Sequence, residues 1–477
     1  MAVYVYNTLT RKKEELAVGG DKVGIYVCGV TPYSDTHLGH ARPSVVWDVI
    51  KKYLHYRGYQ TFHVQNFTDI DDKIINRARE LGMDPLALAE HYSREYLECM
   101  DSLGVARADR YPKVSEHMPD IIALIERLIE RGHAYAVNGN VFYSVLSFPE
   151  YGKLSNQKIE QLQAGTRFEV DPDKRHPLDF AIWKKARPNE PAWGSPWGKG
   201  RPGWHIECSA LSYKYLGSEF EFHGGGCDLI FPHHENEIAQ SEGATGRPLA
   251  KYWLHNGMIN FRHEKMSKSL GNIVTIKEIL KTYPKELVRY FLLSSHYSSE
   301  LEYHDRKLDE IGRGWQRLND CVNTLANLTG KNEMEPQPLD GAAAALAAVV
   351  REAEARFTAA MDDDFNTALA IGVLFDLLHQ VNAYVAGMDH DPSADYALYQ
   401  VYRLFSRLAG DIFGIIKLDG QQAPGLSEPL LELLLELRTE LRSQKQYELA
   451  DRIRDRLAEL NVVIEDTPQG PRWRMRT

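Results

Sequence analysis

A cysteine at the end of an apolar segment is the first group in the chain that could do chemistry. Residues 23–30 are rich in β-branched side chains and close with Cys28, Gly29 and a valine. This segment and the proline-containing turn after it predict a strand, a turn and a helix that starts near Pro43. Cys28 could then be a soft metal ligand at the end of the strand, although a buried structural thiol would give the same pattern.

Two histidines three residues apart follow this segment. His37, Gly39 and His40 would lie where the helix begins, and the first N–H groups of a helix have no backbone partners and carry a partial positive charge. The two histidines could therefore face a bound phosphate together, and Gly39 leaves room for a base or ribose to approach the backbone. Histidines in such a place more often bond to backbone groups, so the pattern needs support from elsewhere in the chain.

That support lies far downstream, in residues 265–269. Two lysines, Lys265 and Lys268, flank small hydroxyl residues in a loop that ends at Gly271. Such a loop can hold a polyphosphate and stabilise the charge that develops on it during displacement. An isolated Lys-x-x-Lys is usually a solvated loop, but the combination with His37 and His40 is much more specific.

Four side chains from three segments could form a metal site. His233 and Glu237 are four residues apart and would share one face of a helix. Cys28 and Cys208 could complete a set of two sulfur, one nitrogen and one oxygen ligand, which suits zinc. Spacing alone does not establish this set, and buried thiols beside a surface His/Glu pair remain the alternative.

The composition bounds the class of protein. The chain has 477 residues, enough for about three domains, and a net charge of −10, so any contact with nucleic acid must be local. No apolar run approaches the length of a membrane span and the first residues do not form a signal sequence, so we expect a cytoplasmic protein with no membrane partner. Five dispersed cysteines argue against a disulfide framework.

The order of predicted elements indicates an α/β fold. A helix over 43–58 and a strand over 61–68 follow the first strand and make a crossover unit of a parallel sheet. The turn between the first strand and this helix contains neither Gly-x-Gly-x-x-Gly nor Gly-x4-Gly-Lys-Ser/Thr, so a nucleotide would be held there in another way. We predict a Rossmann-like parallel-sheet catalytic domain over 1–303 with an insertion at about 105–200, a helical bundle over 304–420, and a small mixed α/β domain over 427–477.

The two motifs, His37–His40 and Lys265–Ser269, together resemble the signature motifs of class I aminoacyl-tRNA synthetases. Members of that class join an amino acid to ATP as an aminoacyl-adenylate and pass the acyl group to tRNA. The resemblance implies Mg²⁺ with the ATP, and the carboxylate of the amino acid as the nucleophile. It implies ATP-binding residues His37, Gly39, His40 and Lys268, and catalytic residues His37, His40, Lys265 and Lys268.

Further blocks resemble the cysteinyl-tRNA synthetase family, and this similarity continues to the C-terminus. The blocks are Cys28-Gly29, 203–209, 223–226 and 231–237. The resemblance implies that L-cysteine binds through its thiolate to one zinc ion held by Cys28, Cys208, His233 and Glu237, a register that excludes His234. It implies substrate contacts from Gly29, Thr68, Trp204 and His223, with a core aromatic as the alternative role for Trp204.

Selection by a metal suits this substrate. Serine differs from cysteine by one atom, and a hydrophobic pocket discriminates only about 10- to 200-fold at the scale of a methylene group. Zinc prefers a thiolate and lowers the pKa of the thiol, whereas a hydroxyl is a far poorer ligand. A separate editing site would then be unnecessary.

The C-terminal residues carry the predicted contacts with tRNA(Cys). Arg472, Trp473 and Arg474 combine cations with an aromatic ring and have no acidic neighbour after Pro468, a pattern typical of phosphate binding and base stacking. A solvated tail is the alternative. The family resemblance implies that this end reads the anticodon and that the helices around 362–366 belong to a tRNA-binding bundle, unless the acidic residues there only cap a helix. We expect a monomer.

Two other functions compete with this one. Residues 30–33 and 36–41 also look partly like the mycothiol cysteine ligase, which makes cysteinyl-adenylate but passes it to an amino-sugar. The block containing Glu237 and the long basic C-terminal part favour the synthetase. A non-catalytic zinc protein that binds RNA is the third possibility, and it is hard to reconcile with two intact phosphate motifs.

Overall fold

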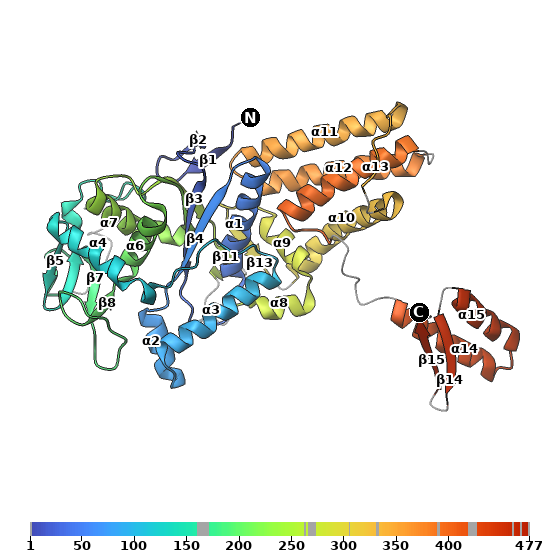
Figure 1. Cartoon of the computed structure of the whole chain (residues 1–477), viewed down its shortest axis with the longest axis horizontal. Coiled ribbons are helices and arrows are strands. Elements are labelled where there is room, and N and C mark those ends of the chain that lie inside the picture. The colour runs from blue at the N-terminus through green and yellow to red at the C-terminus, as the bar shows by residue number, and fades with distance from the viewer. Residues whose placement is uncertain are drawn as a thin grey trace. The chain divides into compact units, whose positions relative to one another are not determined.

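The computed structural model describes residues 2–159, 171–261, 264–265, 273–304, 306–330, 333–388, 392–417, 427–459, 462–467 and 470–475. The chain divides into two compact units, Met1–Lys417 and Leu418–Thr477. The first unit contains the parallel sheet, the insertion and a helical bundle (Figure 1).

A four-stranded parallel sheet is the centre of the first unit. Its strands lie in the order β10-β9-β3-β4, where β3 is Val23–Val30, β4 is Thr61–Phe67, β9 is Phe220–Gly226 and β10 is Ala250–Asn256. The helix α1 (Leu38–Tyr56) connects β3 to β4. The predicted strands over 23–30 and 61–68 and the crossover between them are therefore confirmed, as is the parallel-sheet fold class.

The start of α1 differs from the prediction. The helix begins at Leu38, so Pro43 lies inside it and does not mark its first turn. The His37 side chain accepts a hydrogen bond from the Gly39 N–H and caps the helix. Because the cap satisfies the helix end early, helical structure starts five residues before the proline.

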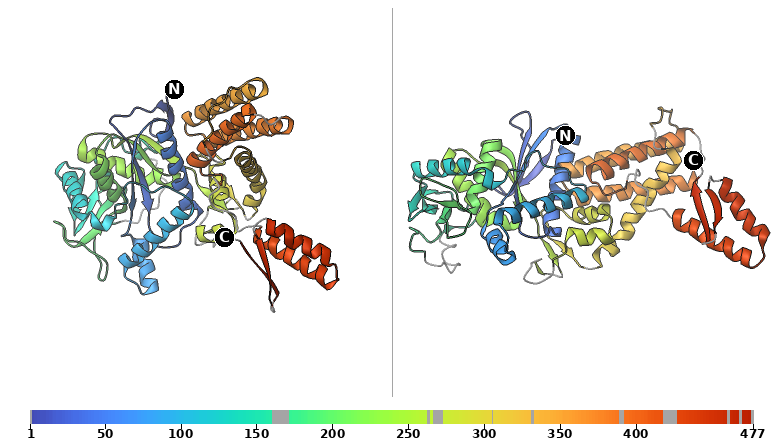
Figure 2. Two further views of the ribbon diagram at one scale, coloured as in Figure 1. Left: turned by 45° about the vertical axis from the view of Figure 1, so that its right-hand side comes forward. Right: turned by 60° about the horizontal axis from the view of Figure 1, so that its bottom comes forward.

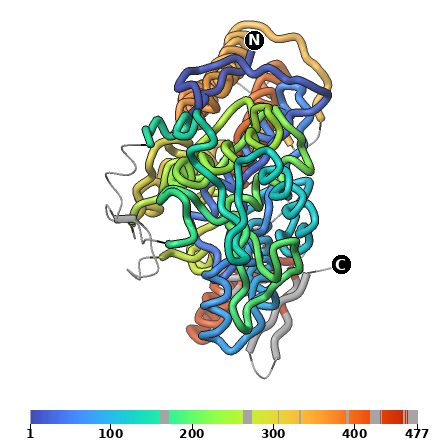
Figure 3. The backbone as a smooth tube through the Cα atoms, turned by 90° about the vertical axis from the view of Figure 1, so that its left-hand side faces the viewer, coloured from blue at the N-terminus to red at the C-terminus, as the bar shows by residue number. Residues whose placement is uncertain are grey.

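The insertion forms an antiparallel sheet beside the parallel one. Asn138-Gly139 makes the predicted hairpin, and the strand order is β5-β6-β7-β8. Figure 3 views the first unit from the side of this insertion. The elements of this region are α2 (Asp72–Leu81), α3 (Pro85–Ser102), η1 (Val114–Glu116), α4 (Met118–Glu130), β5 (Ala134–Val137), β6 (Asn140–Tyr143), η2 (Val145–Ser147), β7 (Phe180–Lys185), β8 (Gly200–Pro202), α6 (Trp204–Leu216), η3 (Cys227–Leu229), η4 (Ile230–His234) and α7 (Glu235–Thr245).

A small sheet and a helical bundle follow the parallel sheet. In the small sheet β11 pairs with β12 and β13. The bundle and the insertion lie on opposite sides of the parallel sheet in all views (Figures 1 and 2). The elements are β11 (Ile259–Phe261), β12 (Glu264–Lys265), α8 (Ile276–Thr282), α9 (Lys285–Leu293), β13 (Leu301–Tyr303), α10 (Lys307–Thr329), α11 (Gly341–Asp362), α12 (Thr367–Gly387), α13 (Pro392–Phe405) and η6 (Ser406–Ile412).

Successive side chains of β3 pack into two different hydrophobic cores. Ile25 and Val27 belong to the core shared with α1 and the bundle, while Tyr26 belongs to the core shared with α6 and the insertion. Successive side chains of a strand point to opposite faces, so Cys28 falls on the same face as Tyr26 and packs against the insertion-side core. The strand therefore places Cys28 on the side of the sheet where α6 and α7 lie.

The N-terminal hairpin connects the parallel sheet to the bundle. It consists of β1 (Tyr4–Asn7) and β2 (Lys12–Glu15). Thr8 N–H donates to the Trp253 carbonyl, and the backbone of Asp364 donates to the Tyr4 carbonyl over 2.9 Å. The Asp364 carboxylate accepts from Tyr6 N–H at 2.8 Å.

The acidic run at 362–364 therefore joins elements rather than capping a helix. Asp362 accepts from Tyr53 on α1 at 2.6 Å and pairs with Arg57, the residue directly after α1. Asp364 binds the N-terminal hairpin, and Asn366 caps α12. The expected alternative of an acidic cap at this position is wrong, because Asn366 occupies the capping position.

Helix α12 departs from the expectation that no apolar run is as long as a membrane span. By length and composition it is the one helix of the described ranges that could cross a membrane, with a mean hydropathy of 1.4. Its residues Ala370, Leu374 and Leu378 are buried in the core shared with α11. A core helix of a globular protein has the same character, so α12 alone is weak evidence for a membrane.

The second unit contains two helices and a hairpin. These are α14 (Ser427–Ser443), α15 (Tyr447–Glu459), β14 (Val462–Thr467) and β15 (Gly470–Met475). The strand predicted at 462–464 extends to Thr467, and the basic segment predicted as a tail pairs with it as β15, with Trp473 opposite Ile464. The sequence does not clearly indicate β15, because the strand begins with Gly470 and Pro471, which are rare inside strands.

Candidate active site and metal centre

Four elements bring the four predicted metal ligands together. Cys28 comes from the end of β3, Cys208 from the second turn of α6, His233 from η4 and Glu237 from the first turn of α7. One ligand atom from each lies within 4.8 Å of the others. Cys208, His233 and Glu237 are almost completely buried, and Cys28 is half-buried.

The distances suit a tetrahedral ion. Cys28 Sγ lies 3.7 Å from Cys208 Sγ and 3.3 Å from Glu237 Oε1, and His233 Nε2 lies 3.0 Å from the same oxygen. Zinc bonds of about 2.0 to 2.3 Å place neighbouring ligand atoms of a tetrahedron roughly 3.3 to 3.8 Å apart. The four atoms match these separations to within a few tenths of an ångström, so the residues fit a metal with thiolate, imidazole and carboxylate ligands.

The charges at the cluster also favour a cation. Burial alone would lower the pKa of His233, but the Glu237 carboxylate and Cys208 raise it to about 10. A hydrogen bond with Cys28 lowers the pKa of Cys208 to about 6. Burial and the hydrogen bond to Cys208 raise the pKa of Cys28 well above its usual value. A divalent ion bound here would keep the two thiols, the imidazole and the carboxylate of the cluster deprotonated at the same time.

His223 lies behind the Glu237 carboxylate. It is completely buried on β9, its Nε2 lies 2.8 Å from Glu237 Oε2, and its ring stacks on Trp253 at 4.2 Å. Glu237 is therefore held between His223 on one oxygen and His233 on the other. An imidazole at this place orients the carboxylate.

His234 lies at the cluster, although the register of the sequence motif excluded it. Its Nε2 is 3.3 Å from Cys28 Sγ, and Cys28, His223 and His234 form a second possible group of three ligands. His234 Nδ1 is already bonded to His255 Nε2 at 2.8 Å. The group with Cys208 and Glu237 offers four ligands and more negative charge, so it is the stronger candidate.

Two predicted substrate residues shape the end of β3. The Gly29 N–H donates to the Asn66 side chain at 2.9 Å, and a Cβ added at Gly29 would lie 1.5 Å from the Asn66 carbonyl oxygen. Only glycine fits this close approach of β3 to β4. Thr68 is buried just beyond β4 and its N–H donates to the Val30 carbonyl at 3.2 Å.

Trp204 is not a core residue. Its side chain is 38% exposed at the first position of α6, and its ring lies 4.2 Å from that of His233. An exposed indole beside a candidate metal ligand can line a site entrance, so the alternative of a core aromatic is wrong.

The histidine motif surrounds the start of α1. The rings of His37 and His40 stack at 3.8 Å, and a Cβ at Gly39 would lie 3.0 Å from the His37 ring. Gly39 thus allows His37 to fold over the helix end. Both the motif and Cys28 lie at the carboxyl end of β3, the edge where parallel sheets bind ligands.

Other predicted residues lie partly or wholly outside the described structure. The backbone of Lys265 belongs to β12, while Lys268 lies outside the described residues. The backbones of Arg472, Trp473 and Arg474 lie in β15 of the second unit. Sequence reasoning did not find Asn66, His205 or His255; of these, His205, which is 2.9 Å from His233, stands inside the quoted 203–209 block and could have been noticed.

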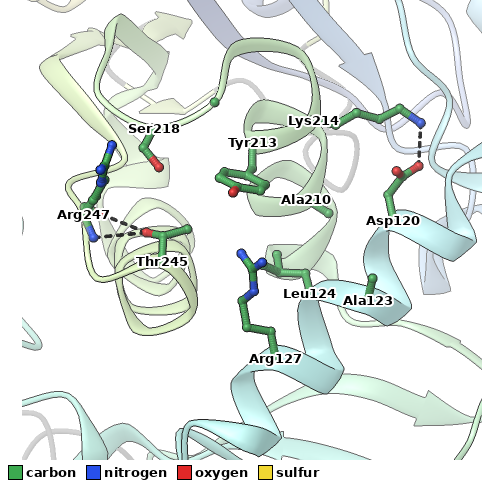
Figure 4. A pocket seen from close by; sticks show the side chains of 11 residues that line it. Asp120, Ala123, Leu124, Arg127, Ala210, Tyr213, Lys214, Ser218, Thr245 and Arg247 are labelled. Carbon is green, nitrogen blue, oxygen red and sulfur yellow. Dashed lines mark hydrogen bonds and ion pairs between the residues drawn. The ribbon is translucent and has the colours of Figure 1, made fainter.

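A separate pocket of about 670 Å³ is lined by residues of α4, of α6 and of the C-terminal end of α7 (Figure 4). Arg127, Tyr213 and Arg247 line it, and Lys214 beside them is paired with Asp120 at 2.6 Å. Neither group of possible metal ligands among the described residues includes a residue of this pocket. It is therefore not a candidate for the metal chemistry of the cluster.

Comparisons with known proteins agree along the whole chain. A family described as tRNA synthetases class I (C) catalytic domain matches residues 15–313. A DALR domain matches 356–417, and a Cysteinyl-tRNA ligase anticodon binding domain matches 423–474. The Cysteine–tRNA ligase of Pelotomaculum thermopropionicum is 51% identical over 491 residues, covering 98% of this chain and 99% of the relative. The chain belongs to the cysteine–tRNA ligase family.

A second relative supports membership of the same family. The Cysteine–tRNA ligase of Thermococcus onnurineus is 48% identical over 478 residues and 99% of both chains. The predicted family and enzyme class, a class I aminoacyl-tRNA synthetase, are confirmed. Because the match to cysteine–tRNA ligases includes the anticodon binding domain, it decides against the amino-sugar ligase and the non-catalytic RNA-binding protein.

Solved structures share the fold of this cysteine–tRNA ligase family member. Mycobacterium tuberculosis methionyl-tRNA synthetase in complex with methionyl-adenylate has a TM-score of 0.64 at 18% identity, covering 82% of this chain and 93% of that chain. An Agrobacterium radiobacter leucyl enzyme in a ternary complex with tRNA has a TM-score of 0.60 at 12% identity, covering 83% and 84%. The class I architecture is thus common to them.

Proposed function

We propose that this enzyme activates L-cysteine with ATP to cysteinyl-adenylate and transfers the cysteinyl group to tRNA(Cys), with release of pyrophosphate and AMP. The observation that carries the proposal is the convergence of Cys28, Cys208, His233 and Glu237 at the same sheet edge as the histidine motif. When bound there, zinc would supply a Lewis acid that favours the thiolate form of the substrate.

The residues around the cluster would orient the amino acid. Trp204 would cover the entrance, and His223 would hold Glu237 in place. Gly29 and Thr68 lie where β3 approaches β4, and they would shape the pocket wall beside the bound cysteine. The carboxylate then needs no general base, because it is already ionised at neutral pH.

The ATP would lie at the start of α1. His37 and His40 would contact its phosphates and ribose side, with Gly39 giving access. Lys265 and Lys268 would stabilise the charge on the α-phosphate during displacement, with Mg²⁺ on the pyrophosphate. Arg472, Trp473 and Arg474 would contact the tRNA. We also propose that the enzyme is a cytoplasmic monomer.

ATP–pyrophosphate exchange tests the first step. Exchange that depends on L-cysteine and is not supported by L-serine is the expected result, together with about one zinc per chain by metal analysis. Incubation with labelled cysteine, ATP and tRNA(Cys) or an amino-sugar acceptor then tests the second step. Labelling of the sugar alone, or the absence of exchange, would refute the proposal.

A further inference from the structure

The segment after the Lys265–Ser269 motif is attached to the histidine motif by backbone hydrogen bonds. Leu38 N–H donates to the Val274 carbonyl at 3.1 Å, and Ile276 N–H donates to the Thr36 carbonyl at 2.9 Å. Between them His37 and Thr275 form an antiparallel bridge. The residues that lead into α1 and those that lead into α8 are therefore one junction, and a shift of either moves the other.

Glu95 on α3 holds both sides of this junction. Its side chain is buried, and one carboxylate oxygen accepts from the Thr36 N–H at 3.1 Å and the Thr36 hydroxyl at 2.6 Å. The other oxygen lies 3.1 Å from Lys277 Nζ on α8 and accepts from Cys99 at 3.1 Å. Lys277 is half-exposed, and its other acidic neighbour, Asp35, is 3.8 Å away.

This arrangement is more than ordinary core packing. A buried carboxylate is costly unless it is hydrogen-bonded and paired, and here its partners are Thr36, directly before His37, and Lys277, eight residues after Ser269 in the sequence. Thr36 precedes His37, and Lys277 follows the segment that ends the 265–269 loop region. A single side chain thus links the residue before His37 to the helix that follows residues 273–275, without itself belonging to either motif.

We propose that Glu95, through its ion pair with Lys277, is a positioning residue for the ATP-dependent step. It fixes the segment that follows the lysine motif against the start of α1, so that both motifs meet the same nucleotide. This inference rests on the proposed function. It predicts that breaking the pair weakens the use of ATP and leaves cysteine binding and the metal cluster unchanged.

Glu95→Gln and Lys277→Gln test the pair from its two sides. The glutamine at 95 still offers an oxygen to Thr36, and the half-exposed position of Lys277 tolerates an uncharged side chain. In exchange assays each variant is expected to raise KM for ATP by about tenfold, while KM for cysteine and the zinc content stay at the wild-type values. The double variant is expected to be no worse than either single one, because both remove the same interaction.

Lys281→Gln is the matched control, since it removes the same charge one turn further along α8. It is expected to keep the wild-type KM for ATP. Equal rises in KM for ATP and cysteine, additive effects in the double variant, or a Lys277→Gln enzyme that behaves like the control would overturn the inference.

Amide hydrogen exchange at residues 274–276 separates this inference from the proposed function. These amides are expected to exchange faster in both variants than in the wild type, and this readout needs no turnover. Unchanged hydrogen exchange at these amides would contradict the positioning role of Glu95, even if the enzyme is active. A wild-type enzyme without cysteine-dependent activity would instead contradict the proposed function and leave the hydrogen-exchange result standing.

Discussion

The proposed function gives Cys208 a part in both metal binding and substrate selection. Its thiol is buried against Cys28, and a thiolate at this position is a far better zinc ligand than a hydroxyl. Cys208→Ser is therefore expected to lose the bound zinc and, with it, the preference for cysteine over serine. Metal analysis and exchange assays with both amino acids measure the two effects.

Cys321→Ala is the control for this change. Cys321 is buried in α10 and lies outside the metal cluster, so its removal is expected to leave zinc content and selectivity intact. A Cys208→Ser enzyme that keeps a full equivalent of zinc would show that the ligand assignment is wrong.

The absence of a side chain at Gly29 allows the end of β3 to approach β4 closely. A methyl group there would overlap the Asn66 carbonyl, so Gly29→Ala is expected to destabilise the enzyme by at least about 2 kcal/mol and to raise KM for cysteine. Denaturant unfolding and exchange kinetics measure the two quantities. At Gly20 a Cβ meets nothing within 4 Å, and Gly20→Ala is expected to be neutral. Equal effects of the two changes would contradict this account.

Residue identities at the cluster could be predicted because the donor types are rare and distinctive. Cys28 and Cys208 are 180 positions apart, so only the resemblance to a family, not the spacing, joined them with Glu237. The role of Asn66 could not be predicted, because its contact with Gly29 depends on how closely two strands approach. The approach of His234 to Cys28 could not be predicted for a similar reason, because it depends on how η4 turns the His234 ring.

At the scale of elements, Arg289 on α9 pairs with Asp48 on α1 and also bonds to Phe413 at the end of the bundle. The Asp48 carboxylate is buried, 2.7 Å from Arg289, and Arg289 Nε donates to the Phe413 carbonyl at 2.8 Å. Burial would raise the pKa of Asp48, but the charges of Arg289 and Lys52 outweigh it, and the pKa is lowered.

The lowered pKa gives this pair a defined pH dependence. The charged carboxylate stabilises the folded state, so its contribution is complete above the unfolded-state pKa of about 3.9 and is lost as the pH falls through the lower folded-state value. Asp48→Asn is expected to cost about 3 to 5 kcal/mol at neutral pH, because Arg289 stays buried without its partner. Its free energy of unfolding is also expected to fall less steeply below pH 5.

Asp376→Asn is the comparison for Asp48→Asn. Its carboxylate pairs with Arg356 at the surface, where both side chains are at least half-exposed, so a change of less than about 1 kcal/mol is expected. Urea unfolding at several pH values measures both variants. If both variants lowered the free energy of unfolding equally, the Asp48–Arg289 pair would have no special part in joining the elements.

Most elements could be predicted from periodicity, and their ends could not. The strands over 23–30 and 61–68 are strongly apolar, and Asn138-Gly139 specifies a tight hairpin. The start of α1 was misplaced because a histidine cap is unusual and proline is the more familiar signal. The acidic run at 362–364 looked like a cap, whereas its partners lie on α1 and the N-terminal hairpin.

For the whole molecule, the proposed function predicts that the division after Lys417 separates cysteine activation from anticodon recognition. Residues 1–417 form a compact unit that contains the metal cluster and the histidine motif. A protein ending at Lys417 is expected to keep cysteine-dependent ATP–pyrophosphate exchange and to lose roughly 100-fold in kcat/KM for tRNA(Cys), as contacts worth about 3 kcal/mol disappear. Equal loss in both assays, with the fold confirmed by circular dichroism, would contradict this division of labour.

The N-terminal hairpin has a consequence for how the chain is made. The hairpin is synthesised before the backbone partners of Thr8 and Tyr4, Trp253 and Asp364, which lie 245 and 360 residues further along the chain. Until those residues emerge from the ribosome, the hairpin lacks the surface against which it packs. Nascent chains of this enzyme therefore carry an unpartnered hairpin while residues 16–364 are made, and it is a natural target for chaperones that hold emerging segments.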